Sequence, residues 1–260
     1  MGEIRHDLSN EEYHQSDAIS SSAAKSVLTS SLYHWKNKSF KATPAMDLGT
    51  VVHDMVLEGG ENSVRGPETR RGKAWTDLKA QCDAQGKTLL TEADYDIADD
   101  MSVAIMADPQ CAKVLAAEDG VREASLFAEC PETGLQLRCR PDIYVPSTNV
   151  MGDVKTCRDA SPRGFGRQAY DLRYDVQAAF YMYVSELCGW DAKYFAFQAV
   201  ENTRPHAACM HVLSDESIEL GRRDMFRALN EIAEAQNTGQ YKTNWPSFNM
   251  IHPPAWMVND

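Results

Sequence analysis

The segment RCRPDIYVPSTNVMGDVKT, residues 138–156, constrains the fold of this chain more than any other. Residues 135–145 and 150–156 are rich in β-branched and apolar side chains, which is typical of strands. The four residues between them, Pro-Ser-Thr-Asn at 146–149, have the composition of a turn. The segment therefore predicts a β-hairpin.

This hairpin brings two acidic residues together. If Val145 pairs with Val150, Asp142 lies directly opposite Asp153, and the period of two places Lys155 on the same face. Like charges directly opposite each other destabilise a sheet unless something compensates. A divalent cation held by carboxylate oxygens would compensate. The hairpin thus indicates a metal site, although a solvated hairpin with scattered charges would also fit the pattern.

The rest of the chain alternates between helical and strand patterns, with no internal repeat. Apolar periodicity and capping residues predict helices at 18–31, 46–58, 74–84, 91–107, 168–188 and 215–237. Further strands are expected at 121–130, 193–200 and 207–213, a basic aromatic loop at 33–41, and a packed irregular tail at 245–256. The order predicts an α/β fold with a central mixed sheet flanked by helices, in a single domain spanning residues 1–260.

Composition narrows the functional class. The 260 residues carry a formal charge of −12, which argues against a generic nucleic-acid coat protein but not against a nuclease with a narrow basic track. Seven cysteines without a CxxC pair argue against a disulfide framework or a zinc ribbon. The polar N-terminus and the absence of a long apolar run predict a cytoplasmic protein that does not contact a membrane.

Three further side chains are candidates for the same site. His53 lies within the helix expected at 46–58, where a lone histidine is more often an ordinary core or surface residue. Gln177 and Tyr181 are four residues apart, which places both on one face of a helix. Neither His53 nor this pair identifies a function alone.

In combination these residues resemble a known family. The segments RPD, GDVKT, LGTVVHDMVLE and YDVQAAFYMY look like motifs of the PD-(D/E)XK nucleases, and more narrowly of the exodeoxyribonuclease VIII (RecE-type) phage exonucleases, distant relatives of the lambda exonuclease. The resemblance covers nearly the whole chain. It implies a restriction-endonuclease-like (PD-(D/E)XK) core in a protein of phage or prophage origin, acting in a bacterial cell.

The resemblance also implies a metal centre. Asp142 and Asp153 would share Mg²⁺, with His53 as a further ligand and the carbonyl group of Val154 as a backbone ligand. Because histidine is not a typical ligand of Mg²⁺, Mn²⁺ is expected to substitute well. Phosphodiester hydrolysis requires an activated water and neutralisation of developing charge, which such a centre would supply.

Three residues would act beside the metal. Lys155 would orient the attacking water or stabilise the transition state, and we favour this positioning role because a lysine between carboxylates normally keeps its proton. Gln177 would hold the water or the scissile phosphate, and Tyr181 would support the site. Arg70, Arg71 and Lys73 in the RRGK loop are candidate phosphate contacts, or else part of a solvated loop.

The expected activity is that of a 5′→3′ exonuclease that degrades one strand of linear duplex DNA and leaves 3′ overhangs. Its expected partners are duplex ends, a single-strand annealing protein (RecT-like) and further copies of itself in a trimeric or tetrameric ring. Three alternatives stay open: a structure- or site-specific endonuclease of the same fold, a non-catalytic DNA-binding recombination scaffold, and a hydrolase of small phosphate esters.

Overall fold

A mixed β-sheet forms the centre of the protein. The computed structural model describes residues 2–39, 42–254 and 257 of the chain. In spatial order the strands of the sheet are β10 (Ala208–Val212), β9 (Tyr194–Glu201), β8 (Val150–Cys157), β7 (Ile143–Val145) and β4 (Val121–Arg122). Strands β8 and β9 are parallel, and the other neighbouring strands are antiparallel. The predicted α/β fold with a central mixed sheet is confirmed.

The two faces of this sheet contact different hydrophobic cores. Ile143, Val145, Val154 and Val200 belong to one core, whereas Tyr144, Met151, Phe195 and Phe197 belong to the other. Successive residues of a strand point to opposite faces, so this alternation fixes the orientation of every side chain on β8. Asp153 therefore shares the face of Met151.

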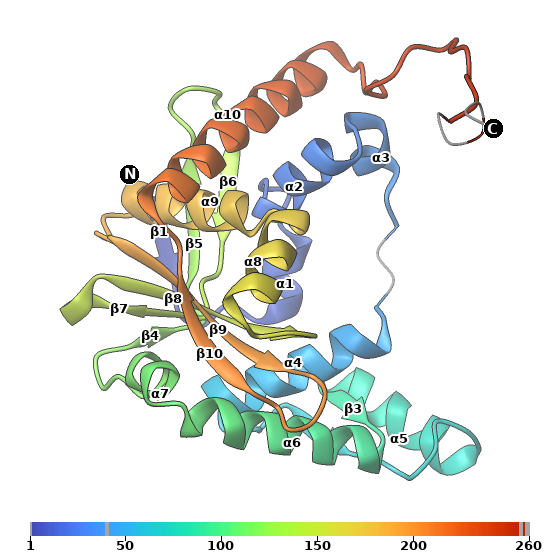
Figure 1. Ribbon diagram of the computed structural model, residues 1–260, viewed down its shortest axis with the longest axis vertical. Coiled ribbons are helices and arrows are strands. Elements are labelled where there is room, and N and C mark those ends of the chain that lie inside the picture. The colour runs from blue at the N-terminus through green and yellow to red at the C-terminus, as the bar shows by residue number, and fades with distance from the viewer. Residues whose placement is uncertain (1, 40–41, 255–256, 258–260) are drawn as a thin grey trace.

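Helices cover both faces (Figure 1). The core around Val154 includes residues of α4 (Pro44–Leu57), α6 (Glu92–Ala107) and α7 (Pro109–Leu115). The opposite core includes residues of α8 (Pro162–Asp171) and α9 (Tyr174–Leu187). The long helix α10 (Asp215–Thr238) packs on α9 from outside. No helix in the described part of the chain is both long and apolar enough to cross a membrane.

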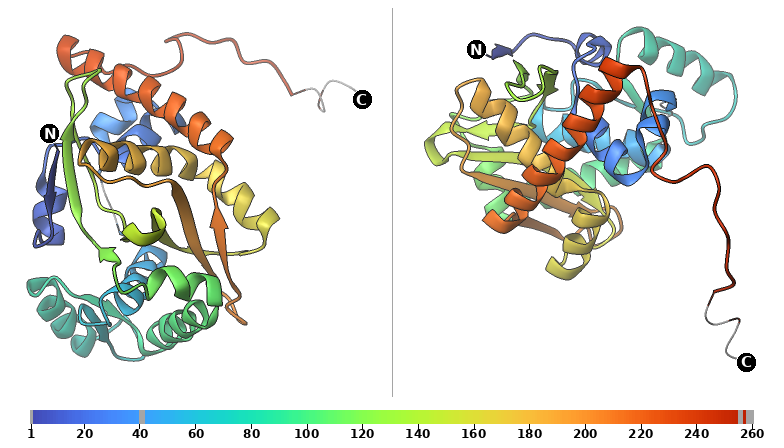
Figure 2. Two further views of the ribbon diagram at one scale, coloured as in Figure 1. Left: turned by 90° about the vertical axis from the view of Figure 1, so that its left-hand side faces the viewer. Right: turned by 90° about the horizontal axis from the view of Figure 1, so that it is seen from above.

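A second, smaller sheet extends the structure beside α9. It consists of β1 (Glu3–Arg5), β5 (Ser125–Glu129) and β6 (Gln136–Cys139), with β5 in the middle. Its core contains residues of α9, α10 and α2 (Ser21–Thr29), which lie together in both views of Figure 2. The remaining elements are α1 (Asn10–Gln15), α3 (Leu32–Asn37), α5 (Lys73–Ala84), the 3₁₀ turn Pro146–Thr148, and the parallel pair β2 (Ser63–Arg65) and β3 (Thr88–Leu90).

Three predicted elements prove to be divided. The strand expected at 135–145 breaks before Ile143, so that β6 and β7 belong to different sheets. The strand expected at 121–130 is interrupted between β4 and β5, where Glu123 has a positive φ of 50°. The helix expected at 168–188 is two helices, because Arg173 has a φ of 55° and ends the run of α8 before α9 begins.

Two predicted irregular segments also differ from expectation. The expected loop at 33–41 contains α3, which Ser31 caps by accepting a hydrogen bond from the N–H group of His34. The tail leaves the body of the protein instead of packing on it (Figure 1), and Phe248 and Ile251 are 79% and 93% exposed. Part of this tail, residues 255 and 256, lies outside the described residues.

Candidate metal-dependent active site

The hairpin of β7 and β8 has the predicted register. Val145 pairs with Val150, and Asp142 lies one residue before β7 begins. The N–H group of Val154 donates a hydrogen bond of 2.5 Å to Oδ2 of Asp142, which holds this carboxylate against β8. Asp142 and Asp153 are only 6% and 2% exposed. The two acidic residues are therefore buried next to each other, as the register requires.

Helix α4 brings His53 to this hairpin. The helix begins at Pro44, where proline needs no intrahelical partner for its nitrogen, and the Thr43 side chain caps it by accepting from the N–H group of Met46. Nε2 of His53 lies 2.8 Å from the carbonyl oxygen of Val154 and 3.2 Å from Oδ2 of Asp142. Three of the four predicted ligand groups thus converge on one point.

Glu123 is a further acidic residue of this site, and sequence reasoning missed it. Ligand atoms of His53, Glu123 and Asp142 all lie within 4.8 Å of one another. The N–H group of Glu123 donates a hydrogen bond of 3.2 Å to the carbonyl oxygen of Asp142. Its left-handed backbone conformation separates β4 from β5, and no local pattern in the sequence signals such a break.

Asp153 interacts with a different set of side chains. The ammonium group of Lys155 forms an ion pair with Oδ2 of Asp153, and Nε2 of Gln177 donates a hydrogen bond of 2.6 Å to Oδ1. Asp153 lies outside the group that Glu123 forms with His53 and Asp142. Asp153 is thus directed toward Lys155 and α9, while Asp142 and Glu123 gather around His53.

Burial and mutual repulsion change the titration of these acids. Burial raises the pKa of the Asp142 carboxyl to about 6, with opposition from His53 and support from Asp153. Burial and then Asp142 raise the pKa of Glu123 to about 9. Burial alone would lower the pKa of Lys155, but Asp153 and Asp142 outweigh it and leave this pKa above its usual value. Lys155 therefore keeps its proton, which favours the positioning role over a role as general base.

We expect Glu123→Gln to flatten the pH dependence of stability in the metal-free protein. The pKa of this carboxyl is about 9 in the folded state and 4.5 in the unfolded reference. The folded state therefore binds the proton more tightly, and the resulting stability is complete below about pH 4.5 and lost as the pH rises to about 9. The free energy of unfolding of the variant should rise relative to wild type across this window, by at most roughly 1.4 kcal/mol per pH unit.

Urea unfolding in EDTA at pH 5.5, 7 and 8.5 measures this difference. Glu118→Gln is the matched control, because Glu118 is an exposed acid from the same part of the chain. Parallel stability curves for wild type and Glu123→Gln would contradict the prediction.

The donor set fits a divalent metal ion. It combines carboxylate oxygens of Asp142 and Glu123 and a backbone oxygen of Val154 with one imidazole nitrogen of His53. Oδ2 of Asp153 is buried and pairs with Lys155 without a hydrogen bond of regular geometry, so a second lone pair of this oxygen can still face a cation. Oxygen-rich sites suit Mg²⁺ and Mn²⁺, and an imidazole ligand shifts the preference toward Mn²⁺.

Tyr181 lies close to the site without bonding to it. Its ring packs edge-on against Phe195 at 6.2 Å between centroids, and burial raises its pKa well above the usual value. No hydrogen bond of its hydroxyl group occurs among the described residues. The structure therefore places Tyr181 against Phe195 at the edge of the apolar core, and its supporting role stays a prediction.

The predicted DNA-binding loop is partly occupied by internal contacts. The guanidinium group of Arg70 lies 3.0 Å from Asp94 and 3.8 Å from Asp47, and it stacks over Trp75. Arg71 and Lys73 are exposed. Arg70 thus attaches the loop to the first turns of α6 and α4. DNA contacts of Arg71 and Lys73 stay a prediction.

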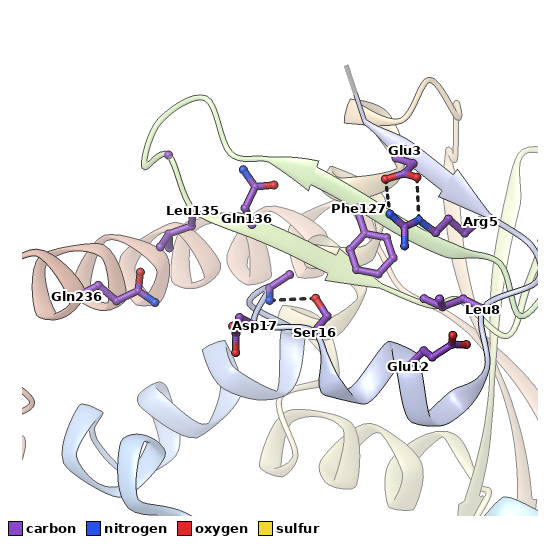
Figure 3. Close-up of a pocket in the computed structure, with 12 residues that line it drawn as sticks. Glu3, Arg5, Leu8, Glu12, Ser16, Asp17, Phe127, Leu135, Gln136 and Gln236 are labelled. Carbon is purple, nitrogen blue, oxygen red and sulfur yellow. Dashed lines mark hydrogen bonds and ion pairs between the residues drawn. The ribbon is translucent and has the colours of Figure 1, made fainter. Parts of the chain in front are cut away.

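A pocket in the described part of the chain lies away from this site. It has a volume of about 760 Å³ and is bordered by β1, α1 and the turn between β5 and β6 (Figure 3). Its charges are paired locally: Arg5 bonds Glu3 and lies over the ring of Phe127, and Glu12 accepts from the Ser9 hydroxyl group. None of the predicted site residues lines this pocket, so it does not belong to the candidate active site.

Comparison with known proteins agrees with this geometry. Residues 18–245 match the model of a family described as PDDEXK-like domain of unknown function (DUF3799). The chain belongs to this PDDEXK-like family. The structure is similar to that of a "putative exonuclease" from Eubacterium rectale, with a TM-score of 0.64, 14% identity and 97% of each chain covered.

A phage-related exonuclease from Haemophilus somnus 129PT is a more distant match, with a TM-score of 0.40, 11% identity, and 90% of this chain and 86% of that chain covered. No curated protein matches the sequence. The PDDEXK-like assignment confirms the predicted nuclease superfamily, whose nucleases use divalent metals, and it supports nuclease activity. The group of His53, Glu123 and Asp142 is a possible metal site. It does not single out the RecE-type exonucleases.

Proposed function

We propose that this PDDEXK-like protein is a Mg²⁺-dependent 5′→3′ exonuclease that degrades one strand of linear duplex DNA. The observation that carries the proposal is the meeting of His53, Asp142 and the carbonyl group of Val154 beside the Asp153–Lys155 pair. Such a site can hold a cation and a fixed positive charge next to a phosphodiester. The proposed direction and the preference for ends rest on resemblance to the RecE-type exonucleases.

The residues of the candidate site have different tasks in this proposal. A bound Mg²⁺ or Mn²⁺ would neutralise charge on the phosphoryl oxygens. Asp142 and Asp153 would hold the cation, with His53 and the Val154 carbonyl group as further ligands. Lys155, which keeps its proton, orients the attacking water and stabilises the negative charge that develops at the phosphorus. Gln177 holds the water or the scissile phosphate, since its amide group is already fixed beside Asp153.

We also propose the biological setting that the RecE-type resemblance implies. The 3′ overhangs would be passed to a single-strand annealing protein in recombination, in the cytoplasm of a bacterium that carries a phage or prophage. A ring of three or four copies around the DNA would keep the enzyme on its substrate despite the acidic composition. Sedimentation of the active protein as a monomer at working concentration would contradict the ring.

Three DNA substrates test the activity: linear duplex with 5′-phosphates, linear duplex without them, and covalently closed circles. Each is incubated with Mg²⁺, with EDTA, and with the Lys155→Ala variant. We expect Mg²⁺-dependent release of nucleotides from linear DNA, fastest with 5′-phosphates, and neither circle cleavage nor activity in the variant. Cut or nicked circles would establish the endonuclease alternative, and DNA binding without any cleavage would establish the scaffold alternative.

A further inference from the structure

Lys25 reaches the candidate active site from α2, and neither the motifs nor the comparisons assign it a role. Its Nζ atom donates a hydrogen bond of 3.2 Å to Oε1 of Gln177, whose Nε2 atom bonds Asp153. Lys25 and Lys155 lie over the same aromatic ring, that of Tyr174, at 5.5 and 5.2 Å from its centroid. The ammonium groups of Lys25 and Lys155 thus lie on the same side of β8.

The fold holds Lys25 in this place. Ala24 and Val27 on either side of it are buried in the core that α2 shares with α9 and α10, which fixes the rotation of the helix. Figure 1 shows α2 and α9 above β8 and α4 below it. The helices that carry Lys25 and His53, α2 and α4, therefore lie on opposite sides of β8, and Lys25 lies next to the Gln177 amide group.

The ammonium group of Lys25 forms no direct ion pair among the described residues, although Asp153 and Asp175 act on it from farther away. Among the described residues, no carboxylate lies within ion-pair distance of its ammonium group, whereas Lys155 is paired with Asp153. An ammonium group offers three donors, and the bond to a neutral amide oxygen uses one of them. Burial, and then the nearby Lys155, lower the pKa of Lys25 to about 8, so the protein holds this charge at a cost.

From this geometry we propose that Lys25 and Gln177 form a phosphate-binding subsite for the DNA backbone at the catalytic centre. The inference rests on the proposed nuclease function and adds a contact to it. A phosphate group beside Gln177 would accept hydrogen bonds from the unused donors of Lys25 and place a negative charge next to its ammonium group. A free carboxylate ligand would also pair with Lys25, but Asp142, Glu123 and Asp153 next to the site would repel it unless a cation were bound. In the proposed mechanism the DNA phosphate binds beside that cation, which offsets the same repulsion.

The salt dependence of DNA binding tests the contact directly. The probe is a 20-base-pair duplex with 5′-phosphates and a fluorescent label, bound by full-length protein in Ca²⁺ in place of Mg²⁺, with a gel to verify that the duplex stays intact. We expect Lys25→Met to weaken the Kd about tenfold at 100 mM KCl. The slope of log K against log [KCl] should fall by roughly 0.9, the value for one lost phosphate contact. Lys25→Arg should keep the wild-type slope.

The control is Lys113→Met, which removes an exposed lysine from α7 and should change neither quantity. A Lys25→Met variant with a wild-type slope would overturn the proposal even if the Kd changed, because a residue that only positions Gln177 does not release a counterion. If Lys25→Met fails to fold by circular dichroism, Lys25→Gln takes its place with the same criteria. Cleavage by the wild-type protein is measured in parallel. If the wild type cuts DNA and Lys25→Met has the wild-type slope, only the subsite is refuted. If the wild type never cuts DNA, the nuclease function is refuted.

Discussion

Asp142→Asn is expected to reduce Mg²⁺-dependent DNA cleavage by about 10³-fold, because in the proposed mechanism the loss of one metal-binding carboxylate removes several kcal/mol of transition-state stabilisation. Asp142 is the carboxylate that contacts both His53 and the N–H group of Val154. An amide in its place can still accept from Val154, but it carries no charge for a cation. Initial rates on linear duplex DNA at saturating Mg²⁺ measure the effect.

The same substitution should stabilise the metal-free protein. Burial raises the pKa of Asp142 to about 6 from a usual value of 3.8, so the ionised form at pH 7.5 is less favourable in the folded than in the unfolded state. Removal of this charge should raise the free energy of unfolding in EDTA by about 1–2 kcal/mol. Mn²⁺ should then raise the Tm of wild type and leave that of Asp142→Asn unchanged.

Asp191→Asn is the matched control, because Asp191 is an exposed aspartate that pairs only with Lys193 among the described residues. It should leave both the cleavage rate and the response to Mn²⁺ at wild-type values. If Asp142→Asn cleaves DNA at the wild-type rate, Asp142 is not a ligand of the proposed metal centre. A lower stability in EDTA would instead mean that the carboxylate is needed for the fold itself.

The part of the site that could be predicted from the sequence is the part that local patterns determine. The turn at 146–149 and the period of two fix the register of β7 and β8, and with it the neighbourhood of Asp142 and Asp153. His53 and Gln177 could be named only through family resemblance, because a helix pattern does not say which strand the helix contacts. Their hydrogen bonds to β8 are tertiary contacts, which depend on how the helices pack on the sheet.

The positions of residues that lie at a break between two regular elements could not be predicted from the sequence. Glu123 and Arg173 have left-handed backbones although neither is glycine, and such conformations persist only where surrounding contacts compensate for them. For Arg173 these contacts are ion pairs to Asp175 at 3.0 Å and to Asp224 of α10 at 2.6 Å. The apolar pattern across 168–188 runs through this position without a sign of the turn, so the sequence alone predicts one continuous helix.

The junction at Arg173 depends on close contact between α9 and α10, and Gly221 permits that contact. A Cβ atom at position 221 would overlap the carbonyl oxygen of Asp175 and lie 2.5 Å from its carbonyl carbon. These are backbone atoms in the first turn of α9, so they cannot rotate away as a side chain would. We therefore expect Gly221→Ala to lower the free energy of unfolding by about 3 kcal/mol, although alanine favours a helix by roughly 1 kcal/mol over glycine.

Gly166→Ala in α8 separates packing from helix propensity, because nothing lies within 4 Å of the Cβ atom that it would add. This control should gain up to about 1 kcal/mol. Gly221→Ala should also lose cleavage activity, since the turn that must shift lies two residues before Gln177. Urea unfolding and cleavage rates of both variants decide the point: equal stabilities would mean that α10 can move outward without cost. A destabilised Gly221→Ala protein with wild-type activity would mean that Gln177 is held by Lys25 and Asp153, independently of α10.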